Sequence, residues 1–139
     1  NWIRHHARSF IFSASMPPAN CATVLAVLDL IDHDNSYRKK VLSLSDRMRD
    51  GLINAGFEIG KSTTPVIPIF IGDDILAFRV YKKLFRHKPR GIFTNPIRPP
   101  AVPHGKELLR TSYMATMNED IIDEALHILI NVGRKMKII

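Results

Sequence analysis

The chain has 139 residues, a hydrophobic fraction of 45% and a formal net charge of +7 at pH 7. This length fits one domain with a proper core, and the longest apolar runs are far shorter than the roughly 20 residues that a helix needs to cross a bilayer, so we expect no integral membrane segment. A single cysteine, Cys21, excludes an internal disulfide and a multi-thiolate metal site and favours a cytoplasmic protein.

The basic residues lie in scattered groups along the sequence, and aromatic residues do not alternate with them as a base-stacking surface requires. We therefore expect a solvated basic face and no nucleic-acid partner. A stand-alone basic α+β domain that binds nucleic acid or another acidic partner is kept as the alternative function.

Two helices are expected in the first half of the chain. Apolar residues recur at helical spacing after Pro17-Pro18 and predict a helix from about Pro18 to Asp32, since proline is tolerated in a first turn. A second amphipathic segment closes at Gly56, in the position where helices often end with glycine. Its expected apolar face consists of Val41, Leu44, Met48, Leu52 and Ile53.

Strands and helices alternate in the second half. The short, β-branched stretch 65–71 reads as a strand whose prolines favour a sheet edge. Asp73 and Asp74 then open a helix, because acidic groups are favoured near a helix N-terminus. A second strand is expected at 91–94, before a stiff, extended proline-rich loop at 95–103.

The last two elements are a strand at 108–113 and a helix that starts at Asn118. Its inward side chains are expected to be Ile121, Ile122, Ala125, Leu126 and Leu129. The whole order predicts an α+β fold with a short three-stranded, mainly antiparallel sheet and helices packed on it.

Two groups of residues suggest chemistry. Ser13 and Ser15 stand just before a predicted helix start, where they either cap the helix or bind an anion. Arg110 lies inside an apolar strand, where its guanidinium needs an anionic partner. Two interpretations of Arg110 have equal weight: it forms a structural ion pair, or it binds the carboxylate of a ligand.

His5 and His6 are adjacent, so their side chains point in different directions and no metal site is expected there.

Three segments resemble successive signatures of the α-oxoamine synthases, which are fold-type I enzymes that depend on pyridoxal phosphate (PLP). They read Arg-Ser-Phe-Ile-Phe-Ser-Ala-Ser-Met-Pro-Pro-Ala at 8–19, Asn-Pro-Ile-Arg-Pro-Pro-Ala-Val-Pro at 95–103 and Leu-Leu-Arg-Thr-Ser at 108–112. They occur in family order and at family-like separation. Within the family, the residue sequences of these segments are most similar to those of serine palmitoyltransferase and 8-amino-7-oxononanoate synthase. The resemblance covers essentially the whole chain.

The resemblance implies a role for particular residues. Ser13 and Ala14 would reach across a homodimer interface to the phosphate of the partner subunit's PLP. Arg110 would bind the carboxylate of the amino-acid substrate, which a fork of N–H donors can hold bidentately, and Ser112 would assist from the same strand face. The loop 98–103 would line the entrance used by the amino acid and the acyl-CoA.

The resemblance also implies what the chain lacks. Met117 stands where these enzymes usually carry a histidine, so a role of that histidine cannot be carried over. No lysine lies in the family's Schiff-base motif, so we expect no catalytic residue in this chain and no covalently bound PLP. Since the sequence begins without Met, it is expected to start in mid-protein. The resemblance then implies a C-terminal part that is inactive alone, with the end of a large domain and the interdomain segment at 1–20 and a small domain at 21–139.

Overall fold

The computed structural model describes residues 1–11 and 16–139 and divides the chain into two compact units, residues 1–35 and 36–139. Ser13 and Ala14, the predicted contacts of the cofactor phosphate, lie outside the described residues. The boundary expected between residues 20 and 21 concerns the domains of a whole enzyme and stays a prediction.

The first unit contains three helices, α1 (Trp2–His6), α2 (Arg8–Ile11) and α3 (Pro18–His33). Helix α3 agrees with the predicted helix to within one residue at its end, and Pro18 occupies its first turn as expected. None of its residues is buried, although much of the helix is apolar. Its apolar side chains therefore form surface in this chain.

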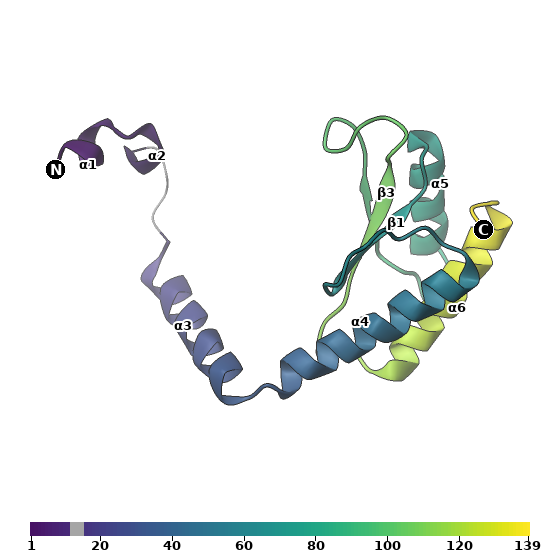
Figure 1. Cartoon of the computed structure of the whole chain (residues 1–139), viewed down its shortest axis with the longest axis horizontal. Helices are drawn as coiled ribbons and strands as arrows, with labels where there is room; N and C mark the ends of the chain where they lie inside the picture. The colour runs from purple at the N-terminus through teal and green to yellow at the C-terminus, as the bar shows by residue number, and fades with distance from the viewer. Residues whose placement is uncertain (12–15) are drawn as a thin grey trace. The chain divides into compact units, whose positions relative to one another are not determined.

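The second unit is an α+β domain, which confirms the predicted fold class (Figure 1). Its helices are α4 (Ser36–Ala55), α5 (Asp74–Phe85) and α6 (Glu119–Lys135). Its strands β1 (Val66–Phe70), β2 (Asn95–Ile97) and β3 (Leu108–Ser112) form an antiparallel sheet in the order β1-β3-β2. The proline-containing strand β1 lies at a sheet edge, as predicted.

The second strand lies a few residues beyond its predicted place. Pairing with β3 selects Asn95–Ile97, and residues 91–94 are irregular. Proline can stand in β2 because it is an edge strand. The Ile92 amide instead donates to the carbonyl of Leu84 at 3.0 Å, which ties the segment to the end of α5. The following proline-rich stretch is not extended, since the Ala101 amide donates to the Arg98 carbonyl at 2.9 Å in a turn.

The three helices cover one face of the sheet, and the core lies between the two layers. The buried side chains come from the edge strand β1, the central strand β3 and the inner faces of the helices. They include Leu44, Met48, Leu52, Ile67, Ile69, Val80, Leu84, Leu109, Ile122 and Leu129. Two side chains predicted to point inward do not, since Ile53 is 53% exposed and Ile121 is 43% exposed. Within residues 36–139, the helices leave the opposite face of the sheet open.

Helix α6 begins where the sequence predicts, because the side chain of Asn118 accepts a hydrogen bond from the Ile121 amide at 3.0 Å. We expect Asn118→Ala to lower the free energy of unfolding by about 1 kcal/mol, since it leaves this amide without its cap. Asn118→Ser, which keeps a capping oxygen, should stay close to the parent. Urea unfolding followed by circular dichroism measures both, and equal stability of the alanine and serine variants would contradict the cap's contribution.

Candidate functional site

Arg110 lies on the central strand of the sheet and points to its open face. Its neighbours across the ladder are Pro68 on β1 and Asn95 on β2. Burial alternates along β3, so that Leu109 and Thr111 are buried while Arg110 and Ser112 are exposed. Hydrogen bonding to strands on both sides holds the backbone at Arg110 firmly, and the guanidinium is presented to solvent from a rigid base.

No carboxylate within residues 1–11 and 16–139 forms an ion pair with Arg110. Other arginines of the same unit do have partners, for example Arg90 with Glu124 at 2.9 Å. The structural ion pair considered from the sequence is therefore not formed in the described part of the chain. The guanidinium of Arg110 is available to an anion from outside it.

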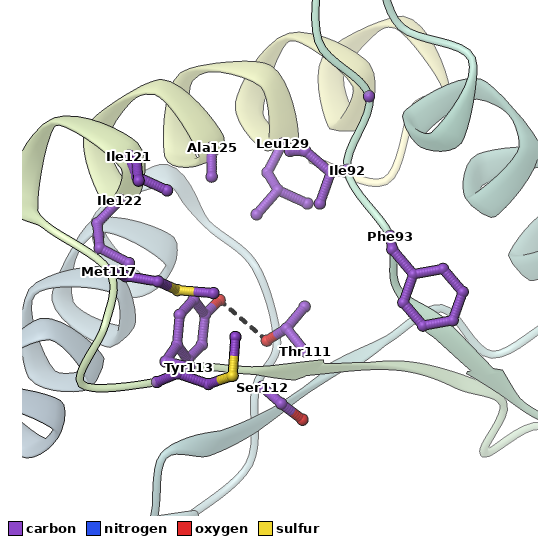
Figure 2. Close-up of a pocket in the computed structure, with 12 residues that line it drawn as sticks. Ile92, Phe93, Thr111, Ser112, Tyr113, Met117, Ile121, Ile122, Ala125 and Leu129 are labelled. Atoms are coloured by element: carbon purple, nitrogen blue, oxygen red, sulfur yellow. Dashed lines mark hydrogen bonds between the residues drawn. The ribbon is translucent and has the colours of Figure 1, made fainter.

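Ser112 lies two residues further along the same open face, as the strand spacing predicts. It also lines an adjacent cavity of about 390 Å³ between the end of β3, the segment 91–93 and the first turns of α6 (Figure 2). The cavity wall is mainly apolar and consists of Gly91, Ile92, Phe93, Thr111, Ser112, Tyr113, Met114, Met117, Ile121, Ile122, Ala125 and Leu129. The partly exposed Ile121 is thus a cavity residue rather than a core residue.

Tyr113 connects the cavity wall to the buried face of the sheet. Its hydroxyl donates to the Thr111 hydroxyl at 3.0 Å (Figure 2), and Thr111 donates to the Ile67 carbonyl at 2.9 Å. Burial raises the pKa of Tyr113 to about 12, although the hydrogen bond with Thr111 acts in the opposite direction. The phenol is therefore neutral at physiological pH and acts as a hydrogen-bond donor. No motif in the sequence pointed to this pair.

Arg98 fixes the proline-rich loop that follows β2. Its Nη2 atom lies 2.7 Å from Oδ2 of Asp74, in the first turn of α5. Because Asp73 caps the same helix by accepting from the Leu76 amide at 2.6 Å, adjacent acidic residues have separate roles. The sequence predicted only that both would favour the start of the helix.

The described residues show neither a metal cluster nor a membrane span. No group of three or more histidine, cysteine, aspartate or glutamate side chains could hold a metal ion within residues 1–11 and 16–139. In the same ranges, no helix is long and apolar enough to cross a membrane.

The architecture of residues 36–139, a small sheet with helices on one face, is that of a domain from fold-type I PLP enzymes, to which the solved structures similar to this chain belong. The family model for aminotransferase class I and II matches residues 1–129. The chain belongs to the aminotransferase class I and II family.

Individual relatives agree with the resemblance seen in the sequence. Serine palmitoyltransferase of Bacteriovorax stolpii is 44% identical over 128 residues, which are 92% of this chain and 30% of that protein. 8-amino-7-oxononanoate synthase of Geotalea daltonii is 40% identical, over 98% of this chain and 34% of that protein. A solved structure of a serine palmitoyltransferase (SPT) with its PLP internal aldimine is also similar, with a TM-score of 0.86 and 27% sequence identity. The match covers 99% of this chain and 34% of that one.

The resemblance to this group of PLP-dependent enzymes is therefore confirmed. The chain spans about a third of the length of the relatives that it matches. The nucleic-acid-binding alternative gains no support from them.

The raised pKa of Tyr113 predicts a late step in an alkaline titration. Because the folded state favours the neutral phenol, its contribution to stability is complete below pH 10 and is lost as the pH rises toward about 12. Subtracting the ultraviolet titration of Tyr113→Phe from that of the parent should isolate one phenolate that appears near pH 12. Circular dichroism at each pH confirms folding, and a difference curve centred near pH 10 would show that burial does not shift this group.

Proposed function

We propose that this chain supplies the C-terminal small domain of a PLP-dependent α-oxoamine synthase. Such an enzyme condenses an amino acid with an acyl-CoA thioester and releases carbon dioxide and coenzyme A. The observation that carries the proposal is the unpaired, exposed Arg110 on the rigid central strand of a chain similar to serine palmitoyltransferase and 8-amino-7-oxononanoate synthase. The specific amino acid and acyl group are left open.

In this proposal Arg110 holds the carboxylate of the amino acid. A guanidinium presents parallel N–H donors that match the two carboxylate oxygens, so it fixes orientation as well as position. Fixing the carboxylate also fixes the direction of the bonds at the substrate Cα atom, which decides which bond is broken. The hydroxyl of Ser112, on the same face, donates a further hydrogen bond to this ligand.

An apolar cavity lies beside Ser112, but Arg110 is not one of its lining residues. Thr111, Ile122 and Leu129 do line it, so it opens on the helix-covered side of the sheet and is not used for the contact between Arg110 and the carboxylate. Met117 contributes to the cavity wall, in the position where the family usually carries a histidine. This methionine makes the cavity more apolar than the family pattern implies.

PLP, when bound, supplies an electron sink for the carbanion formed at the amino-acid Cα atom. The described residues fit the amino-acid end of such a site, because an unpaired guanidinium faces the open side of the sheet. The proposed contact with the cofactor phosphate is made by Ser13 and Ala14 and reaches the partner subunit, so we propose a homodimer. We place the enzyme in the cytoplasm.

Substitution of Arg110 in the enzyme that contains this chain tests the proposal. Since a hydrogen-bonded charge pair contributes about 1.5–3 kcal/mol, Arg110→Ala should raise the KM for the amino acid by about 10- to 150-fold. The KM for the acyl-CoA should stay unchanged. Arg110→Lys should recover only part of the loss, because an ammonium group cannot bind a carboxylate bidentately. Steady-state release of coenzyme A measures both constants.

Arg134→Ala is the matched control, since Arg134 is also an exposed arginine but lies in the last turn of α6. It should leave both KM values unchanged. An Arg110→Ala enzyme with an unaltered KM for every amino acid tested would overturn the assignment.

A further inference from the structure

The outer side of α5 carries a surface that the proposed catalytic role does not use. The helix buries Ala77, Val80 and Leu84 against the core. Its opposite side exposes basic and aromatic residues together, and we call this surface the basic–aromatic face; it consists of Phe78, Arg79, Lys82, Lys83, Phe85 and Arg86. Phe78 and Arg79, and likewise Phe85 and Arg86, are adjacent in the sequence, and helical spacing places both pairs on one side of the helix.

The charge of this face is uncompensated. Residues 75–90 contain six lysine and arginine residues and no acidic residue. Within residues 1–11 and 16–139, none of the four basic residues of the face forms an ion pair. They line a shallow depression of about 530 Å³ together with His87 and Met136. Clustered cations on one side of a helix attract an anionic partner.

The aromatic part of the face is a connected cluster. Ring centroids lie 6.0 Å apart between Phe78 and Tyr81, 5.9 Å between Tyr81 and Phe85, and 6.3 Å between Tyr81 and Phe93. Phe78, Phe85 and Phe93 are nevertheless 54%, 55% and 72% exposed. Figure 2 shows the ring of Phe93 directed away from the cavity residues. An exposed apolar cluster beside cations indicates an interaction surface.

We propose that the basic–aromatic face docks on the surface of a bilayer containing anionic phospholipids, with α5 lying in the plane of the interface. Lysine and arginine side chains are attracted to acidic headgroups, while phenylalanine rings enter the boundary with the acyl chains. An anionic bilayer therefore accounts for both the basic and the aromatic residues of the face. The proposal does not depend on the catalytic role of Arg110.

The alternative polyanion, a nucleic acid, explains only the charge. Stretches of single-stranded nucleic acid bind in a basic groove whose separate aromatic rings each receive a base, whereas these rings form one cluster around Tyr81. Helix α3 offers a useful contrast, because it also exposes apolar side chains but carries two aspartates and no lysine or arginine. Exposed apolar surface alone would favour α3 equally, and only α5 adds the matching charge.

Sedimentation of the chain with lipid vesicles tests the proposal. We expect binding to vesicles of phosphatidylcholine mixed with phosphatidylglycerol, weak binding to phosphatidylcholine alone, and a loss of binding as salt is raised. K82Q/K83Q should weaken binding to the anionic vesicles by about 30-fold, at about 1 kcal/mol for each lysine. The control K39Q/K40Q removes the same charge from an adjacent, exposed lysine pair on α4 and should bind as the parent does.

The aromatic half of the face has its own pair of variants. F78A/F85A should lose binding at least as strongly as the lysine variant, whereas L25A/L28A, which removes exposed apolar side chains from α3, should not. Circular dichroism confirms that each variant is folded. Equal binding to neutral and anionic vesicles, equal losses in the two lysine variants, or binding to an RNA oligonucleotide without binding to vesicles would each overturn the proposal.

Discussion

The fold depends on the alternation of side chains along β3. As the middle strand, β3 must bury Leu109 and Thr111 beneath the helices, and this forces Arg110 and Ser112 onto the open face. A slip of one residue would place the guanidinium in the core, where an unpaired charge is very costly, and would expose Leu109. The register of β3 that packs the core is therefore also the register that exposes the side chains of the candidate site.

Helices and strands were predicted correctly where the residues at their ends, or their own apolar pattern, are sufficient to identify them. Helix α6 begins at the capping residue Asn118, as the sequence predicts. For α5 the sequence predicts only that Asp73 and Asp74 favour the start of the helix, and the structure shows that Asp73 is the cap. Strand β3 was predicted from its apolar pattern. Strand β2 was misplaced because its position is set by pairing with β3, and both candidate stretches, 91–94 and 95–97, are short and apolar in part.

Contacts between distant residues could not be predicted in this way. Arg98 and Asp74 are 24 positions apart, and only the fold brings their side chains within 2.7 Å. The sequence likewise left the two interpretations of Arg110 equal, since the choice between an internal carboxylate and a ligand depends on what lies across the sheet. The resemblance to a family, rather than any spacing of residues, supplied the cofactor and the reaction.

The two proposals use opposite sides of the same domain. Helix α5 packs on the sheet through Ala77, Val80 and Leu84, so its basic–aromatic face points away from the sheet. Arg110 lies on the other side of the sheet, on the face that the helices of residues 36–139 leave open. A bilayer bound at α5 would therefore leave the open face free for a substrate and for the rest of an active site. Since the packed core and the sheet lie between the two surfaces, a substitution on one surface should not disturb the other.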